Sequence, residues 1–502
     1  MRESLWKAHA PTPTFTELTE EIEAEVAIVG GGITGITTAH LLAKAGKQVV
    51  VLESGKVGGG TSGDSTGNLY TMLDHRLHHI KAKFDDETAR KVAGSRTAAV
   101  DLIEQLQDQL SIDCSFKREP WILYSETEKK NQTIETTKKT LEQFGLEVET
   151  LSDLPLPFPV STAIRVENQA QFNPAAFVQG LAEKTSAEGC RIFTNTPVHH
   201  IEKGSPHLLE TPKGKIRAQQ VILATHTPKG VYGLHTELFP HREYAIAVKL
   251  RSGDYPEGIF WDTEAKNHQS VRSYESAEGK FLVLVGQHHK VGQAEEEKDY
   301  FGELEKNARK NFDIASVAYK WSAQHYKPAD GLPYIGESSD DNIFVASGFS
   351  TDGLTYGVVS AMLFRDLLTG KEHACEKIYD PKRFTPLKSA KNFIKGNLNV
   401  AKQYLEDYPG NVDAEEFSAI GPGEGKIVEV KDEKWAVHRD LEGNLHTCSA
   451  VCTHMDCIVN WNAMERTWDC PCHGSRFKSS GEVIEGPALS PLDKRNIKPM
   501  NK

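Results

Sequence analysis

The sequence contains no long hydrophobic run. No apolar stretch in its 502 residues approaches the ~20 consecutive residues that a helix needs to cross a bilayer. Residues 1–13 also lack the apolar core of a signal peptide. We therefore expect a protein without a transmembrane segment or signal peptide, located in the cytoplasm.

The sequence also lacks an excess of positive charge. Lysine and arginine together number 58, against 70 aspartates and glutamates, so the formal net charge is -12. This balance argues against a nucleic-acid partner, which normally meets a basic surface. A hydrophobic content of 38% with 25% charged residues is typical of a folded globular protein. The length predicts about two or three domains.

Cysteine is scarce, and half of it is concentrated in one stretch. Four of the eight cysteines are scattered and are expected to be buried thiols: Cys114, Cys190, Cys375 and Cys448. Among the other four, Cys452 and His454 form a C-x-H pair, and Cys470 and His473 form a C-x-x-H pair. These two cysteines and two histidines fit the ligands of a Rieske-type 2Fe–2S cluster. In such a cluster two thiolates bind one iron and two neutral histidines bind the other.

A structural zinc site and a disulfide knot are the alternatives for this stretch. Zinc also accepts cysteine and histidine ligands. Zinc fingers, however, usually pair Cys-x-x-Cys with His-x-x-x-His, whereas each short segment here carries one cysteine and one histidine of the four. Gly474, Ser475 and the Gly486–Pro487 pair also match the Rieske pattern. The stretch therefore resembles a Rieske domain of the disulfide-stapled kind found in respiratory and photosynthetic complexes.

This resemblance implies three further features. Cys457 and Cys472, one in each segment, would form the disulfide, although a reducing cytosol normally disfavours such a bond and both can stay as thiols. The hydroxyl of Ser475 would donate a hydrogen bond to a bridging sulfide. Phe477 stands where high-potential members have a tyrosine. The missing hydrogen bond to a ligand sulfur predicts a lower reduction potential.

Near the N-terminus, the sequence predicts a dinucleotide-binding fold. Residues 1–19 are largely polar and are predicted to form an extended arm. A short apolar run over 24–29 then leads into the sequence G-G-G-I-T-G, a helical pattern follows over 33–45, and a second strand over 48–52 ends at Glu53. A strand, a G-x-G-x-x-G turn, a helix, a second strand and a terminal acid in this order indicate dinucleotide binding.

Each residue of this motif has a physical role. Gly30 would allow the tight turn, and Gly32 would let a pyrophosphate approach the backbone. Gly35 would let the helix and the strand pack closely. The start of the helix would bind the phosphate through its N–H groups and dipole. Glu53 would accept hydrogen bonds from the adenosine ribose.

Beyond this motif, most of residues 24–370 resemble the glycine/D-amino acid oxidase (DAO) family of FAD-dependent enzymes. Loop 58–68 is similar to the family's small-residue loop, which crosses beneath the flavin. Residues 196–198 resemble the strand whose backbone meets the adenine. Residues 347–354 match a C-terminal flavin loop, although the glycines of this segment can also be simple turn residues. The resemblance implies FAD contacts from Gly30, Gly32, Ile33, Thr34, Gly35, Glu53, Ser54, Gly60, Thr61, Ser62, Val198, Ala224, Gly348, Phe349, Gly353 and Leu354.

The mode of FAD attachment can also be predicted. Several oxidases of this family attach FAD covalently through a histidine or cysteine. Neither residue type occurs in segments 61–68 and 348–356. We therefore expect non-covalent FAD. In the family, backbone N–H groups of the last segment lie at a helix start, where they would stabilise negative charge on reduced flavin.

The resemblances imply the fold class and the domain organisation. We expect an α/β FAD-binding Rossmann-type fold with a β-rich α+β substrate domain, together residues 1–370, and a C-terminal all-β Rieske domain. The predicted boundaries are 24–89, 166–240 and 321–370 for the FAD-binding domain, 90–165 and 241–320 for the substrate domain, 371–415 for a linker, and 416–502 for the Rieske domain. Within the linker, apolar residues recur with helical spacing from Ile394 to Tyr408. They predict a docking helix, the alternative being a solvated helix.

The substrate domain offers few specific signals. Relatives in the DAO family usually bind a substrate carboxylate through arginine or lysine, and the candidates are Arg242 and Arg272, at or near strands of the predicted roof over the flavin. Surface ion pairs are the alternative reading. Thr355 stands where sarcosine-oxidase-like members carry a lysine, which argues against a sarcosine-like substrate. His288 and His289 could orient a substrate or move a proton, or could be ordinary core or surface histidines.

Together these features predict a redox enzyme with two cofactors, FAD and a 2Fe–2S cluster. An amine or amino-acid-like substrate would transfer a hydride to the flavin, and electrons would pass singly through the cluster to an external one-electron carrier or quinone. One alternative is an oxidase with a structural or regulatory Rieske domain. Another is an electron-transfer or redox-sensing module without an organic substrate.

Overall fold

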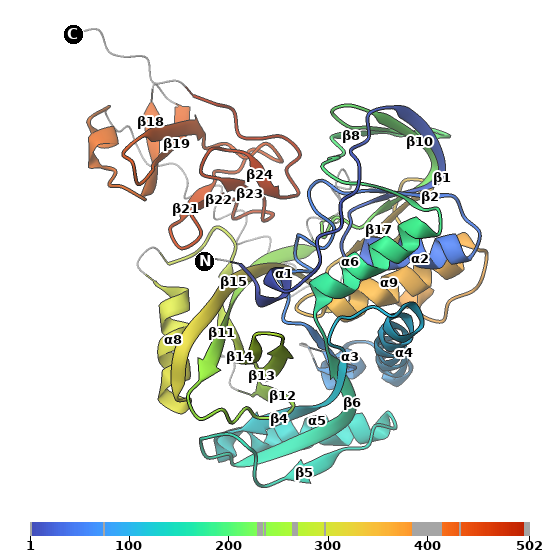
Figure 1. Cartoon of the computed structure of the whole chain (residues 1–502), viewed down its shortest axis with the longest axis vertical. Helices are drawn as coiled ribbons and strands as arrows, with labels where there is room; N and C mark the ends of the chain where they lie inside the picture. Colours follow the sequence, from blue (N-terminus) through green and yellow to red (C-terminus); the bar gives the residue numbers. More distant parts are fainter. Residues whose placement is uncertain are drawn as a thin grey trace.

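The chain folds into a larger N-terminal body and a smaller C-terminal domain (Figure 1). The computed structural model describes residues 3–73, 76–227, 234, 237–263, 270–295, 298–383, 414–430 and 433–495. We call 3–383 the N-terminal body and 414–495 the C-terminal domain. The docking helix predicted between Ile394 and Tyr408 lies outside the described residues.

The first sheet of the N-terminal body is the core of a nucleotide-binding fold. Its strands are β1 (Glu21–Val29), β2 (Val49–Leu52), β7 (Arg191–Phe193), β8 (His200–Glu202), β9 (His207–Glu210), β10 (Lys215–Leu223), β16 (Tyr334–Glu337) and β17 (Ile343–Ser347). The main order is β16-β17-β10-β1-β2-β7, parallel except where β16 pairs with β17. All four residues of β2 are apolar and buried, as in parallel strands covered on both faces.

Helices cover this sheet. α2 (Ile33–Lys44) packs against both α6 (Pro174–Ala187) and α9 (Gly353–Leu368). α4 (Asp86–Leu110) packs against α9 and α6 in turn. The remaining described helices of this body are α1 (Leu5–Ala8), α3 (Leu77–Lys83), α5 (Asn131–Gln143), α8 (Tyr300–Asn311), α10 (Glu376–Tyr379) and the 3-10 turn η1 (Glu128–Lys130).

The second sheet is the predicted β-rich part of the body. Its strands are β3 (Asn68–Leu69), β4 (Lys117–Ser125), β5 (Glu149–Leu151), β6 (Thr162–Gln171), β11 (Leu238–Leu250), β12 (Ile259–Asp262), β13 (Ser270–Ser276), β14 (Gly279–Lys290) and β15 (Ile314–Pro328). Its order is β15-β11-β14-β13-β12-β4-β6-β3, with β5 beside β6. Along β11, Tyr244 and Ile246 face α8, while Ala245 and Ala247 pack with α1 on the other face, as strand alternation requires.

The N-terminal arm differs from the extended segment predicted for residues 1–19. Leu5 and Trp6 lie in the short helix α1, and both are fully buried. The Trp6 ring packs edge-on against Tyr274 and Trp321 of the second sheet. These two apolar side chains of the polar arm are thus buried against an apolar face of the second sheet, and burial of their apolar area stabilises the helix.

Residues 196–198 do not form the predicted strand. They lie in the connection between β7 and β8. The amide of Thr196 donates to the carbonyl of Glu53 at 2.9 Å, so the segment crosses the end of β2 instead of extending the sheet. Val198 still reaches the cavity described below.

The C-terminal domain consists of two small antiparallel sheets, as the all-β prediction requires. The first holds β18 (Gly425–Val430), β19 (Glu433–Arg439) and β20 (Leu445–Ser449), preceded by the 3-10 turn η2 (Ala414–Ala419). The second holds β21 (Asn460–Asn462), β22 (Thr467–Asp469), β23 (Arg476–Lys478) and β24 (Val483–Glu485). Figure 1 shows the second sheet on the side that faces the N-terminal body.

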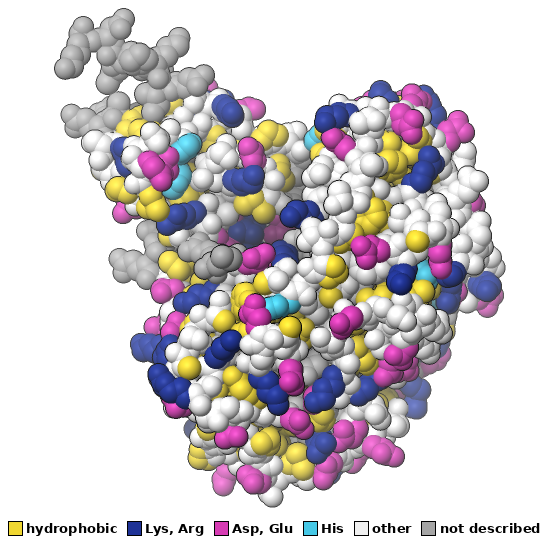
Figure 2. Space-filling view, in the orientation of Figure 1, with side chains coloured by type: hydrophobic (Ala, Val, Ile, Leu, Met, Phe, Trp, Pro, Cys, Tyr) yellow, Lys and Arg dark blue, Asp and Glu magenta, His cyan; other side chains and the backbone are white. Residues whose placement is uncertain are grey.

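The face drawn in Figure 2 shows no large patch of one charge among the described residues. On the face drawn in Figure 2, acidic and basic side chains are interspersed, and the surface is indented between the C-terminal domain and the nucleotide-binding part of the body. Among the described residues, no helix is both long and apolar enough to span a membrane.

Candidate functional site

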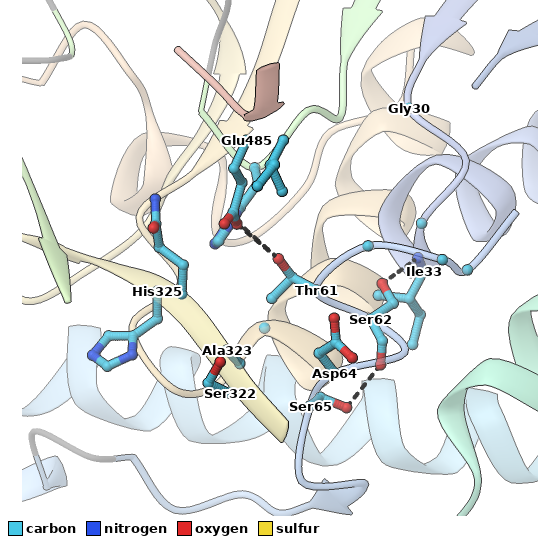
Figure 3. A pocket seen from close by; sticks show the side chains of 18 of the residues that line it. Gly30, Ile33, Thr61, Ser62, Asp64, Ser65, Ser322, Ala323, His325 and Glu485 are labelled. Atoms are coloured by element: carbon cyan, nitrogen blue, oxygen red, sulfur yellow. Dashed lines mark hydrogen bonds and ion pairs between the residues drawn. The ribbon is translucent and has the colours of Figure 1, made fainter. Parts of the chain in front are cut away.

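At the turn between β1 and α2, backbone atoms pack so closely that side chains larger than hydrogen would clash at some positions. Gly30 has a φ of +114°, which side chains other than glycine rarely adopt. A Cβ at Gly35 would overlap the carbonyl oxygen of Gly30, so helix and strand touch backbone to backbone. At the helix start, the Ile33 amide donates to Ser62 Oγ at 3.0 Å (Figure 3). The sequence thus builds the close backbone approach that a pyrophosphate requires.

Glu53 is fixed at the end of β2 by two backbone amides. Its Oε2 accepts from the Gly31 amide at 2.7 Å, and its Oε1 accepts from the Gly55 amide at 2.7 Å. The two amides therefore hold the carboxylate beside the glycine turn. This is the position in which a carboxylate can accept hydrogen bonds from a ribose.

The turn, the end of β2 and loop 58–68 line one cavity of 1310 Å³. Its volume exceeds the roughly 300–1,000 Å³ of ordinary small-ligand pockets, which leaves space for a dinucleotide and a substrate. All predicted cofactor contacts line it except Gly35, which packs on Gly30, and Gly348, which packs near Leu238 and Pro328. The lining set is Gly30, Gly32, Ile33, Thr34, Glu53, Ser54, Gly60, Thr61, Ser62, Val198, Ala224, Phe349, Gly353 and Leu354.

A buried ion pair holds the start of α9 at this cavity. Gly353 and Leu354, in the first turn of α9, line the cavity. Arg96 of α4 is fully buried, and its guanidinium lies 3.2 Å from the carboxylate of Asp352. It also donates to the carbonyls of residues 70–72. Arg96 thereby ties the amide-rich end of α9 to the segment that follows loop 58–68.

The C-terminal domain supplies part of the cavity wall. Glu465, Arg476, Val483 and Glu485 are among its lining residues. Thr61, in the loop predicted to cross beneath the flavin, donates to Glu485 Oε1 at 3.3 Å (Figure 3). The C-terminal domain therefore reaches the same cavity that the glycine turn opens into.

A buried network of charges joins the two parts at this wall. Arg242 of β11 lies 2.7 Å from Glu465 and 3.7 Å from Glu485. Arg476 of β23 pairs with Glu465, with Asp469 at 3.1 Å and with Glu485 at 3.4 Å. Four of these five side chains are less than 10% exposed, and Glu485 is 21% exposed. Each charge in the network is therefore compensated away from bulk water, as a buried charge must be.

The structure separates the two arginines predicted to bind a substrate carboxylate. Arg242 lines the cavity but is engaged by Glu465. Arg272 is not among the residues that line this cavity in the described part of the chain. Its guanidinium donates to Gln171 Oε1 at 2.7 Å and stacks 4.6 Å from the ring of Trp6.

His289, a weaker candidate, also lies away from the cavity. It is buried and lies 2.9 Å from the hydroxyl of Tyr244. Burial lowers its pKa. We find no geometry in the described residues that places His289 against a substrate.

Two loops of the C-terminal domain carry the predicted cluster ligands. The first loop, 452–457, is closed by a hydrogen bond from the Cys452 amide to the Cys457 carbonyl at 2.8 Å, and the second loop, 470–475, by one from the Cys470 amide to the Ser475 carbonyl at 2.8 Å. The rings of His454 and His473 stand edge to face with centroids 5.0 Å apart. All four predicted ligands thus converge between the two loops.

The predicted disulfide joins the two loops. Cys457 and Cys472 are bonded, with an S–S distance of 2.11 Å, and both are 2% exposed. Both sulfurs are therefore shielded from solvent. The bond also consumes two of the thiols that a zinc site would use. The scattered cysteines are buried and unbonded, as predicted: Cys114, Cys190, Cys375 and Cys448.

Burial and one hydrogen bond set the protonation states of the loop residues. Burial lowers the pKa of both His454 and His473 to about 4, so the two imidazoles are neutral at pH 7. The hydrogen bond from Cys470 lowers the pKa of Cys452 to about 7 and raises the pKa of Cys470, so Cys470 keeps its proton until a bound metal displaces it. Neutral imidazoles and thiolates are the forms that bind metal. This donor set fits a 2Fe–2S cluster.

The two loops face different surroundings. Met455, at the tip of the first loop, is 42% exposed. The second loop lies against β11 and β15, and His473 is only 8% exposed. His473 is buried because the N-terminal body covers its loop.

Comparison with known proteins identifies both parts. A sequence model of the FAD dependent oxidoreductase (DAO) family matches residues 25–367. The chain belongs to this family. A second model, of the Rieske [2Fe-2S] domain, matches residues 412–496 of this oxidoreductase. The enzyme therefore carries FAD and a 2Fe–2S cluster, and the alternative of a structural zinc site is rejected.

Known proteins resemble this oxidoreductase over different lengths. The "Putative Rieske 2Fe-2S iron-sulfur protein YhfW" of Bacillus subtilis strain 168 is 35% identical over 98% of this chain and 97% of its own. The gamma-glutamylputrescine oxidoreductase of Escherichia coli K12 is 25% identical over 71% of this chain and 86% of its own. The crystal structure of glycine oxidase from Geobacillus kaustophilus has a TM-score of 0.61 at 20% identity, and covers 72% of this chain and 99% of its own. The last likeness shows the fold of the N-terminal body.

Replacing Phe477 by tyrosine should raise the reduction potential of the oxidoreductase's cluster. Phe477 is fully buried with the ligand cysteines in one apolar cluster, so a hydroxyl added there would lie near the ligand sulfurs. A hydrogen bond to sulfur stabilises the electron-rich reduced cluster. A redox titration followed by EPR would measure the shift. An unchanged or lower potential in the variant would count against this role of residue 477.

The contact between the Rieske domain and the N-terminal body should weaken in acid. Burial alone would raise the pKa of Glu485, but a hydrogen bond from His226 and the charges of Arg476 and Arg242 hold it at about 2. Because the folded pKa is below the ordinary value of 4.5, the stabilisation is complete above about pH 4.5 and is lost as the pH falls toward about 2. Urea midpoints measured across this range should fall more steeply for the native protein than for Glu485→Gln. Parallel curves would contradict the assignment.

Several residues that line or support the cavity, or join the two parts, were not predicted from the sequence. Arg96, Gln324, Tyr326, Glu465 and Glu485 belong to no motif, and each meets its partners only in the folded chain. The buried Trp6 carried a weak signal, since a Leu-Trp pair in a polar arm is unusual.

Proposed function

We propose that this protein is a dehydrogenase for an amine or amino-acid-like substrate. Hydride transfer to FAD from a carbon next to nitrogen would be followed by one-electron transfer through the Rieske cluster to an external one-electron carrier or quinone. One observation carries the proposal: Glu465, Arg476 and Glu485 of the Rieske domain line the same cavity as the FAD-binding glycine turn. A domain built into the cofactor cavity is better explained by electron transfer than by a separate role.

The relatives support the substrate class. Glycine oxidase and gamma-glutamylputrescine oxidoreductase carry names that specify an amino acid and an amine. The substrate part of the cavity is lined by aromatic side chains of the second sheet and α8, among them Tyr244, Trp261 and Phe301. These groups would exclude water and hold the alkyl part of a substrate. Arg242 would bind a carboxylate only by exchanging it for Glu465, which already fills that position.

The two cofactors divide the redox chemistry, since FAD accepts two electrons together and the cluster accepts one. The chain's own residues prepare the site for both. The amides at the start of α9 point positive partial charge toward the cavity, which would favour negative charge developing there. Arg96 holds this helix end in place through Asp352. Cys452, His454, Cys470 and His473 would hold the iron.

An anaerobic screen of amines and amino acids tests the proposal. The holoenzyme is mixed with each compound in a stopped-flow instrument, and the flavin and cluster absorbances are followed separately. We expect flavin bleaching first and cluster bleaching second. Cluster bleaching before flavin bleaching would reverse the proposed direction. Absence of any bleaching across the screen would favour an electron-transfer module without organic substrate.

The second candidate function is an oxidase with a structural Rieske domain, and the oxidase names of several relatives favour it. The yield of hydrogen peroxide separates this oxidase from the dehydrogenase. In air and with an added one-electron acceptor, the dehydrogenase should form little hydrogen peroxide per turnover. A yield near one peroxide per substrate, unaffected by the acceptor, would support the oxidase.

A further inference from the structure

The backbone of the second Rieske loop lies directly against side chains of the N-terminal body. Gly474, next to His473, has a φ of +81°, and a Cβ there would lie 2.6 Å from the Pro240 side chain of β11 and 2.9 Å from Gln324 Nε2. Pro471 of the same loop approaches Gly292 as closely. Only glycine at these positions allows the loop to lie this close to β11 and β15.

A buried side chain binds the loop at its point of closest approach. Gln324 Nε2 donates to the carbonyl of Gly474 at 2.8 Å and to the hydroxyl of Tyr326 at 2.7 Å. The Tyr326 hydroxyl donates to the carbonyl of Gly486 at 3.2 Å. Gln324 and Tyr326 are each 1% exposed. Two residues on one face of β15 therefore hydrogen-bond to the Rieske domain, Gln324 to the second ligand loop and Tyr326 to the backbone after β24.

The other end of this connection lies at the FAD cavity. The carbonyl of Tyr326 accepts from the Ser350 amide at 3.0 Å, and Ser350 lines the cavity beside Phe349. The Tyr326 ring packs edge-on against His226, with centroids 4.8 Å apart. His226 Nδ1 lies 3.3 Å from Thr61 Oγ1 in the FAD loop. Tyr326 thus contacts the cavity wall twice.

Other contacts also join the two parts. Arg242 pairs with Glu465 of the β21–β22 turn, and Arg476, which follows the second loop, pairs with Glu465 in turn. This path crosses two ion pairs, whereas the Gln324 hydrogen bond ends on the carbonyl of Gly474 inside the loop. Asn460 Nδ2 donates to the carbonyl of Gly292 at 2.8 Å, also from β21. Electron tunnelling decays more slowly along covalent and hydrogen bonds than across gaps. The Gln324–Tyr326 pair offers an unbroken route of this kind.

We propose that Gln324 and Tyr326 form the electron route from the FAD cavity to the second cluster loop, and that they are positioning residues for transfer, not redox carriers. The proposal rests on the proposed function. In each transfer one electron leaves the reduced flavin, one Fe(III) of the cluster becomes Fe(II), and any proton released by the flavin passes to solvent. Gln324 and Tyr326 keep their hydrogens and are neither oxidised nor reduced. Burial raises the pKa of Tyr326, which is consistent with a hydroxyl that stays protonated.

Flash photolysis of the full-length holoenzyme tests this route. A photoreduced deazaflavin delivers single electrons under anaerobic conditions, and the first-order redistribution between flavin and cluster is followed at their absorbances. Gln324→Leu and Tyr326→Phe are compared with Asn460→Ala. The Asn460 variant removes an amide-to-carbonyl hydrogen bond of the same 2.8 Å length across the same contact, but off the route. Cluster EPR spectra and both midpoint potentials are recorded for every variant.

We expect Gln324→Leu to slow redistribution by about tenfold, Tyr326→Phe to slow it less, and Asn460→Ala to leave it unchanged, with EPR spectra and potentials as in the native protein. Equal slowing in Asn460→Ala would show that only docking matters and would overturn the route. Native rates in Gln324→Leu, or slowing that follows entirely from a shifted potential, would also overturn it. If the native protein itself shows no redistribution, the proposed function fails, and that outcome is distinct from the others.

Discussion

Gly35→Ala should strongly weaken FAD binding. A Cβ at this position would overlap the carbonyl oxygen of Gly30, and Gly30 itself lies too close to the Ala224 carbonyl at the end of β10 to move aside. The helix would have to move away from β1, and its amide-rich start would move with it. Overpacking of this kind costs about 1–3 kcal/mol, which corresponds to roughly 5- to 150-fold weaker FAD binding if the cost falls on the bound state. The protein should purify largely without flavin.

Gly94→Ala provides the matched control for this substitution. Gly94 lies inside α4, and a Cβ there would have no neighbour within 4 Å. Alanine should stabilise the helix by about 0.5–1 kcal/mol and leave FAD binding unchanged. The flavin-to-protein ratio and a titration of the apoprotein with FAD measure both variants. Native FAD affinity in Gly35→Ala would show that the turn does not hold the cofactor.

Arg476→Leu should destabilise the Rieske domain by about 3–5 kcal/mol, because it leaves buried carboxylates without their main cation. Arg476 is 6% exposed, and its guanidinium contacts Glu465, Asp469 and Glu485. Arg242 can compensate only part of this charge from the other side of the contact. Urea unfolding followed by the cluster absorbance would measure the loss.

The control is an arginine of the same domain in a solvent-exposed pair. Arg495 lies 3.0 Å from Glu433, with side-chain exposures of 28% and 59%. Exposed pairs contribute about 0–1 kcal/mol, so Arg495→Leu should change the urea midpoint little. Equal loss in the two variants would mean that burial of the Arg476 network contributes no special stability.

The parts of the site that the sequence predicts are those encoded by local spacing. The glycine turn lies within one short segment and the four cluster ligands lie within two, so the order of residues in each segment indicates their geometry. Glu53 follows a strand directly, and its contact with Gly31 is set by the parallel pairing of β1 with β2. Local sequence patterns of this kind are enough to predict the nucleotide-binding fold, the all-β C-terminal domain and both cofactors.

The contact between the two parts could not be predicted in this way. Arg242 and Glu465 are 223 residues apart in the chain, and Gln324 and Gly474 are 150 apart. Nothing in the residues around Arg242 distinguishes a partner in the C-terminal domain from a substrate carboxylate. Arg242 was predicted to bind substrate, and it does line the cavity. The sequence could not show that a carboxylate of the same chain, that of Glu465, already pairs with it.

The buried N-terminal helix has a practical consequence for anyone who shortens this protein. The family match starts at residue 25, so trimming to it looks harmless. Such a truncation would remove Trp6 from Tyr274 and Trp321, and would uncover the guanidinium of Arg272. A trimmed preparation would expose apolar surface beside the second sheet and should aggregate. Aggregation of such a preparation would then say little about the catalytic competence of the intact chain.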